Sequence, residues 1–201
     1  MRDVTSENFG LLIAYLLPGF VVLWGARPLV PGVALWLAAS PGTAPTVGGF
    51  LYATLGSVAA GMFVSALRWA VIDTLHHHTG IPEPRWDFAR FPANAAAIDS
   101  LVYDHYRYYQ HYANMLVALG IAYAARAWAG EIFPGQGGWW DLGFLLVGVV
   151  LYLGSRDALR KYYQRTASIL ISRTVSGIRT VESAGPPSRP SATATSTAEK
   201  P

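Results

Sequence analysis

The chain has 201 residues, of which 52% are hydrophobic and only 13% are charged, and its formal net charge is +3. Soluble domains carry about a quarter charged residues, so the composition indicates a protein of the lipid bilayer. Cysteine is absent from the sequence. That absence excludes a disulfide framework, a thiol nucleophile and a thiolate metal site.

The first predicted span covers residues 9–26, an uncharged stretch long enough to cross a hydrocarbon core of about 30 Å. Pro18 in its middle predicts a kink, because proline removes one backbone hydrogen bond. A cleaved signal peptide is the alternative, although the apolar run exceeds a usual h-region and acidic residues share its n-region. Residues 29–39 are apolar but too short to span, so we expect an interfacial helix, with a re-entrant segment or a continued first helix as alternatives.

The second predicted span covers residues 47–67 and carries a stripe of small side chains at a spacing of four. These residues are Ser57, Gly61 and Ser65. Small residues let helix backbones approach closely in lipid. We expect this stripe to pack within the chain, and a contact between subunits is the alternative.

Residues 68–112 form a polar stretch between the two apolar halves of the chain. All five histidines and five of the 12 acidic residues lie in it. The helical pattern of the second span continues to His78, where Gly80 and Pro82 stop it. Residues 94–112 are again predicted to be helical. The stretch is therefore interpreted as a stalk of helices outside the membrane.

Two further spans are predicted, at residues 113–128 and 139–155. A basic helix over 156–181 continues the fourth span, and the tail 182–201 is rich in Pro, Ser, Thr and Ala and should be disordered. Basic residues near a membrane surface attract anionic lipids. The candidates for this contact are Arg156, Arg160, Lys161 and Arg165.

The distribution of charge predicts the orientation of these four spans. Of the 15 Lys and Arg residues, all but Arg27 and Arg126 fall on the side that holds both termini and the stalk. The positive-inside rule places that side in the cytoplasm, so a plasma or inner membrane protein is expected. Aromatic belts agree with this placement. Their members are Phe9, Trp69, Tyr108, Tyr109, Tyr112 and Tyr152 on the inner side, and Trp24, Trp128, Trp139 and Trp140 on the outer side.

A metal site in the stalk is one functional hypothesis. Asp73, His76 and His77 share one helical face by their spacing, and Asp104 and His111 share another. Imidazoles and carboxylates suit Zn, Fe or Mn. The alternative, which we favour, is a hydrogen-bonded collar in which Arg68 pairs with Asp73, and Arg107 pairs with Asp104.

No sequence motif names a reaction. The sequence lacks a phosphate-binding glycine loop, a nucleophile elbow and a zinc-protease motif, and its aromatic and basic run fits an interfacial belt better than nucleic-acid binding. We therefore expect an all-α, polytopic integral membrane protein with four transmembrane helices and cytoplasmic extensions. We expect it to be non-enzymatic and homo-oligomeric, and its stalk to receive a partner or signal, with a pore-forming effector as one version.

Two other functions remain open from the sequence. One is a metal-dependent membrane enzyme that uses the histidines and aspartates of the stalk. The other is a passive channel for small solutes, lined by single polar residues that in helices more often serve packing. These polar residues are Tyr15, Thr54, Ser57, Ser65 and Asn114.

Overall fold

The computed structural model describes residues 12–37, 46–84, 86–132 and 138–170, and within these ranges the chain forms helices joined by turns and loops, without a strand. The all-α prediction is thus confirmed for this part of the chain. The predicted disordered tail, 182–201, and the end of the basic helix, 171–181, lie outside the described residues. The elements in chain order are η1 (Leu12–Leu16), α2 (Leu17–Ala26), α3 (Pro31–Leu37), α4 (Val47–Arg68), η2 (Trp69–Asp73), α5 (Thr74–His78), η3 (Phe88–Arg90), α6 (Phe91–Leu101), η4 (Val102–Tyr106), α7 (Arg107–Trp128) and α8 (Trp139–Leu170).

The first helix continues through Pro18 because a π-helical turn, η1, precedes it. A π turn widens the helix and relieves the clash of a proline ring with the preceding turn. Pro18 has no N–H to offer to the carbonyl of Ala14, four residues earlier. That carbonyl instead accepts a hydrogen bond from Nδ2 of Asn114 on α7, at 2.7 Å. Asn114, which the channel hypothesis places in a pore, is fully buried and serves packing.

Residues 29–39 contain the short helix α3. The axis of α3 is bent by 119° from that of the preceding helix, Ala14–Ala26. Trp36 of α3 stacks on Tyr52 of α4, with 5.8 Å between the ring centroids. With seven residues, α3 is too short to cross a membrane. This length is compatible with a helix at the membrane interface, which stays a prediction.

The second span and the start of the stalk form one continuous helix, Val47–His78, as the sequence predicts. Its end is a Schellman motif, in which Gly80 has a φ of 94° and Ile81 N–H donates to the carbonyl of His76 at 3.1 Å. Glycine adopts this left-handed backbone without strain. At 1.5 Å per residue, 32 residues extend about 48 Å, roughly 18 Å more than a hydrocarbon core.

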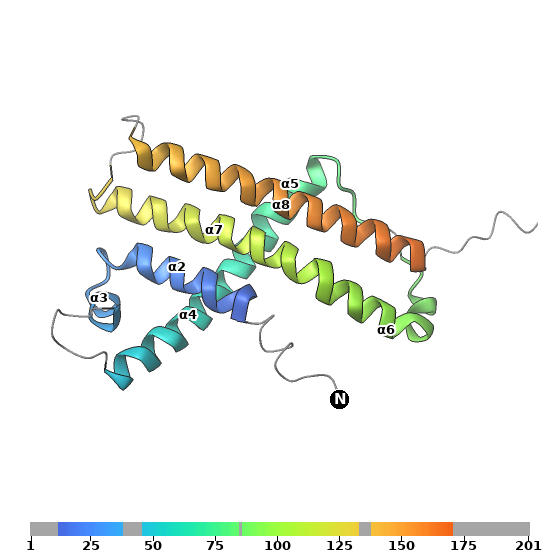
Figure 1. Ribbon diagram of the computed structural model, residues 1–201, viewed down its shortest axis with the longest axis horizontal. Helices are drawn as coiled ribbons and strands as arrows, with labels where there is room; N and C mark the ends of the chain where they lie inside the picture. Colours follow the sequence, from blue (N-terminus) through green and yellow to red (C-terminus); the bar gives the residue numbers. More distant parts are fainter. Residues whose placement is uncertain (1–11, 38–45, 85, 133–137, 171–201) are drawn as a thin grey trace, which may run out of the picture. The chain divides into compact units, whose positions relative to one another are not determined.

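The second half of the chain also forms long helices. Residues 91–128 are helical throughout, with the π turn η4 between α6 and α7, which confirms the predicted helix over 94–112. The predicted continuation of the fourth span is confirmed as far as Leu170, where the described part of α8 ends. Figure 1 shows α7 and α8 side by side, with α3 near the end where α7 stops and α8 begins, and α6 at the other end.

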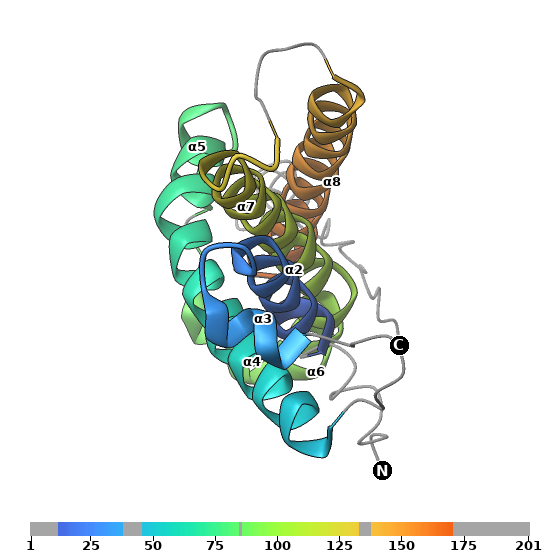
Figure 2. The same ribbon diagram turned by 90° about the vertical axis from the view of Figure 1, so that its left-hand side faces the viewer.

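Helix α2 lies between α4 and α7 and contacts both (Figure 2). The approach to α4 is close, because a Cβ on Gly19 would lie 1.7 Å from the carbonyl oxygen of Ser57, and a Cβ on Gly61 would lie 2.0 Å from that of Tyr15. Ser57 and Gly61 are both buried here. Ser57 and Gly61 therefore pack within the chain, as expected of the small-residue stripe, whereas Ser65, its third member, lines an open groove.

Arg126 and Trp24 join α7 to α2 at the end opposite the stalk. The Arg126 guanidinium lies 3.6 Å from the Trp24 ring centroid, and it forms an ion pair with Glu131 at 2.7 Å. Asp141 of α8 accepts a hydrogen bond from the Tyr123 hydroxyl. Two charged residues thus lie within the limits of the third and fourth predicted spans, and both have protein partners.

Two described helices, Val47–His78 and Asp141–Leu170, are long and apolar enough to cross a membrane, and the bent pair Ala14–Ala26 and Pro31–Leu37 makes a third if it counts as one span. Only 17% of each apolar window in the two helices is buried, whereas helices of soluble proteins cover their apolar face. The structure therefore supports a membrane protein. Helix α7 has 22 residues but is not apolar enough to join them, so four crossings exceed what the structure supports.

Candidate functional site

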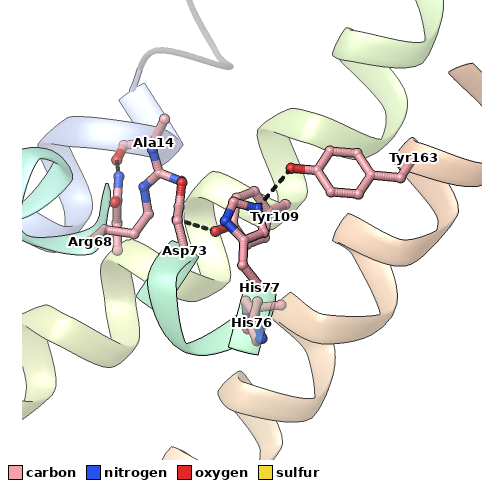
Figure 3. Close-up of polar contacts among 9 residues, drawn as sticks. Ala14, Arg68, Asp73, His76, His77, Tyr109 and Tyr163 are labelled. Atoms are coloured by element: carbon pink, nitrogen blue, oxygen red, sulfur yellow. Dashed lines mark hydrogen bonds and ion pairs between the residues drawn. The ribbon is translucent and has the colours of Figure 1, made fainter. Parts of the chain in front are cut away.

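The most polar part of the described interior lies where α4 passes into η2 and α5. We call it the polar junction and define it by five side chains that link this helix to α7 and α8, of which Arg68, Asp73, His76 and Tyr109 are labelled in Figure 3. They are Arg68, Asp73, His76, Tyr109 and Ser155. Arg68, His76 and Ser155 are among the few polar residues that are almost completely buried in the described chain.

Arg68 and Asp73 form the ion pair of the junction, as expected from their closeness in the sequence. Nη1 of Arg68 donates to both carboxylate oxygens, at 3.0 and 3.3 Å. In an ordinary α-helix, residues five apart point in different directions, since each residue advances about 100°. The π turn η2 occupies Trp69–Asp73 and closes i to i+5 hydrogen bonds, so it brings these two residues onto one face. The exposed fractions of the two side chains are 5% and 17%.

Tyr109 of α7 completes the environment of Asp73. Its hydroxyl donates a hydrogen bond to Oδ1 of Asp73, and the Arg68 guanidinium lies 5.2 Å from its ring centroid. Burial, together with the hydrogen bond to Asp73, raises the pKa of Tyr109 above its ordinary value, so the phenol remains a donor. Tyr109 is only 1% exposed. Its predicted place in a lipid-facing belt is therefore wrong, while its neighbour Tyr108 is exposed.

His76 connects α5 to α8. Its Nε2 lies 3.0 Å from Oγ of Ser155, and that hydroxyl donates its hydrogen to the carbonyl of Tyr152 at 2.8 Å. Ser155 must then accept from His76, which assigns the proton to Nε2. Nδ1 of His76 is buried and has no hydrogen-bond partner within the described chain. A second proton on this ring would lack an acceptor, and burial lowers the pKa of His76, so the site favours a neutral imidazole.

Two further contacts fix α5 and its end to α8. Nε2 of His77 lies 3.3 Å from the hydroxyl of Tyr163, and the two rings stack with centroids 6.4 Å apart (Figure 3). The guanidinium of Arg156 donates to Oγ1 of Thr79 at 2.7 Å and to its carbonyl oxygen at 2.5 Å. Arg156, a predicted lipid contact, is thus engaged within the protein.

The structure distributes the predicted metal ligands among different partners. Asp73 binds Arg68 and Tyr109, His76 binds Ser155, and His77 binds Tyr163. His111 packs its ring against Tyr112, and the side chain of Asp104 lies outside what the structure describes. Among the described side chains, no three His, Asp or Glu residues gather as metal ligands would. The metal site stays a prediction, and an ion there would have to displace these hydrogen bonds.

An aromatic cluster next to the junction was not predicted. Trp86, from the segment before η3, makes edge contacts with Tyr162 and Tyr163 of α8, at centroid distances of 6.1 and 6.2 Å. Tyr106 of η4 packs on Tyr162 at 5.1 Å. This cluster holds the segment between α5 and α6 against α8. The sequence shows many tyrosines here, but it does not show which of them face inward.

The remaining candidates for a channel lining lie in a groove or between helices of one chain, and a pore built by several subunits stays a prediction. Tyr15, Thr54 and Ser65 line an open, mostly apolar groove between η1 and α4, with a volume of about 850 Å³. Ser57, like Asn114, is buried between helices. The polar side chains of the spans therefore serve packing or border a surface groove.

Comparison with protein-family models, with curated proteins and with solved structures finds no match for the chain.

Proposed function

We propose that the chain is a non-enzymatic, multi-pass protein of a plasma or inner membrane. It crosses the bilayer four times, at about 9–26, 47–67, 113–128 and 139–155, with both termini in the cytoplasm. Its stalk, residues 68–112 and the extension of α8, receives a soluble partner or a signal. The charge distribution supports the orientation, since it leaves only Arg27 and Arg126 on the outer side.

The observation that carries this proposal is the length of the helix Val47–His78 together with the position of the polar junction. If residues 47–67 fill the hydrocarbon core, Arg68 is the first residue beyond it. The junction then lies where the helix enters the cytoplasm, which is where charged groups and their partners are tolerated. Through the junction, a force on α5 acts on α7 and α8 at once, because Asp73 binds Tyr109 and His76 binds Ser155.

Two exposed apolar side chains mark a surface for the partner on this extension. Val71 and Leu75 are 56% and 43% exposed, and a spacing of four residues places them on the same side of the helix. We place the centre of the partner's contact at these two neighbouring apolar side chains. The surface lies on η2 and α5, the elements that also carry Asp73 and His76, so a partner bound there would act directly on the polar junction.

The basic residues of α8 would hold the stalk near anionic lipids. Arg160, Lys161 and Arg165 are exposed, and each basic residue near such a surface contributes about 1 kcal/mol. Nζ of Lys161 forms an ion pair with Oδ2 of Asp157, at 2.6 Å. The homo-oligomer expected from the sequence stays part of the proposal, but its contact cannot use Ser57 and Gly61, which face η1 and α2 of the same chain.

The experiment is site-specific photo-crosslinking in the cells that produce the protein. A photoreactive amino acid at Leu75 should capture a soluble protein. The same amino acid at Leu153, an equally apolar residue that is 56% exposed and lies in the fourth span, should capture lipid only. If Leu75 and Leu153 give the same lipid products, the proposal of a partner on the stalk is wrong.

A further inference from the structure

The groove between η1 and α4 is a hollow on the described part of the chain that the proposed function leaves unused. Its volume of about 850 Å³ falls within the range of roughly 300–1,000 Å³ found for small-molecule sites. A smaller hollow of about 230 Å³ adjoins it and shares Leu12, Leu16 and Thr54. The walls are mostly apolar, and several of the side chains at its mouth are exposed, among them Met62 and Trp69.

The groove follows α4 from Thr54 to Trp69. These positions are fifteen residues apart, which corresponds to about 22 Å of helix. This is longer than one leaflet of the hydrocarbon core, about 15 Å. A single extended acyl chain therefore fits the groove lengthwise. If Trp69 lies at the interface, the far end of the groove at Thr54 lies within the membrane.

One end of the groove is polar. Arg68 lines it and is only 4% exposed. Its Nη1 donates to Asp73. A guanidinium carries five N–H donors, so an oxygen of a ligand at this end of the groove can accept from one that Asp73 does not use.

We propose that this groove binds one membrane glycerophospholipid. One acyl chain lies along α4 between Val58 and Met62 on one wall and Leu16 on the other, and an ester or phosphate oxygen accepts a hydrogen bond from Arg68. This rests on the proposed membrane placement, which sets Arg68 and Trp69 at headgroup level and the apolar part of the groove inside the leaflet. A lipid so bound would touch the polar junction directly through Arg68.

The test measures lipid binding to the full chain by native mass spectrometry, with dioleoyl phosphatidylglycerol added to delipidated protein as the probe. We expect one lipid bound more tightly than the rest. Ala66→Phe fills the groove at a lining position and should weaken this binding at least tenfold. Ala124→Phe makes the same change at an exposed position on α7, outside the groove, and should leave it unchanged.

Met62→Trp is a second blocking variant, useful if Ala66→Phe fails to fold, since Met62 is 63% exposed and tolerates a larger side chain. Equal binding by the blocked variants and by Ala124→Phe overturns the proposal. The proposal is also overturned if a blocked variant is a monomer where the unaltered chain is a dimer, because the groove would then hold a second copy of the chain. An alkaline carbonate wash of membranes separates the two proposals. If the wash releases the chain, the proposed membrane placement is wrong. If the chain stays in the membrane but the purified protein binds no lipid tightly, only the proposed lipid site in the groove is wrong.

Discussion

The hydroxyl of Tyr109 donates a hydrogen bond to the carboxylate of Asp73, 36 residues earlier in the chain. Asp73 also holds Arg68, so one carboxylate joins the end of the α4 helix to α7. All three groups are largely withdrawn from solvent. In such surroundings a hydrogen bond to a charged group contributes more than one at the surface, and the junction should be sensitive to single substitutions.

Tyr109→Phe removes the donor and keeps the ring. Because the hydrogen bond is made to a charged, largely buried carboxylate, we expect the free energy of unfolding to fall by about 1.5–3 kcal/mol. Tyr108→Phe is the matched control, since Tyr108 is 54% exposed, and it should change stability by less than about 0.5 kcal/mol. Denaturation in detergent, followed by circular dichroism, measures both. Equal stabilities of the two variants would contradict the described position of Tyr109.

Arg68→Met leaves the carboxylate of Asp73 in a buried place without its cation. Breaking a buried ion pair on one side costs about 3–5 kcal/mol. The exposed pair of Lys161 and Asp157, with side chains 54% and 60% accessible, offers a comparison within the same protein. Lys161→Met should cost at most about 1 kcal/mol. The same unfolding measurement applies, and a small effect for Arg68→Met would show that Asp73 is not buried with it.

Ser155→Ala leaves Nε2–H of His76 without an acceptor. We expect a cost of about 1–3 kcal/mol, the usual penalty for a buried unpaired donor. Ser168→Ala is a close control on the same helix, because its hydroxyl also donates to a carbonyl three residues earlier, at 2.7 Å, but the residue is exposed. That control should be nearly neutral. Thermal unfolding of both variants measures the difference, and equal melting temperatures would argue against the contact between α5 and α8.

Gly19→Ala tests the close packing of α2 on α4. The added methyl group would meet the carbonyl of Ser57 at 1.7 Å, so the helices must separate, and overpacking of this kind costs about 1–3 kcal/mol. Gly143→Ala in α8 has open space around it and should be neutral or stabilising by up to about 1 kcal/mol. Unfolding in detergent distinguishes the two. A neutral Gly19→Ala would mean that α2 does not approach α4 as closely as described.

Local patterns in the sequence were sufficient to predict the long helices and their ends. Gly80 and Pro82 stop the helix at His78, and the closeness of Arg68 and Asp73 in the sequence suggests their pairing, although the π turn that brings them onto one face was not predicted. These features depend on neighbouring residues, whose chemistry can be read directly. Hydropathy was less decisive, because α7 combines apolar residues with His111 and Asn114 and falls below the level of a clear span.

The contacts between distant segments could not be predicted. His76 meets Ser155, 79 residues later, and no local pattern carries such a pairing. The sequence pattern predicts Tyr109 in a lipid-facing belt with its neighbour Tyr108, although adjacent helical residues point about 100° apart. The spacing of Tyr106, Tyr109 and Ala113, at three and four residues, was the available signal, since all three pack together in the core.

Single-cysteine labelling tests the central claim, that a helix crosses the membrane and continues into the cytoplasm as a stalk. The chain has no cysteine of its own, so a membrane-impermeant maleimide reports each introduced residue separately. We predict that Gly138→Cys is labelled in intact cells and that His78→Cys is labelled only after the cells are opened. Labelling of His78→Cys in intact cells would place the polar junction outside the cell and contradict the account.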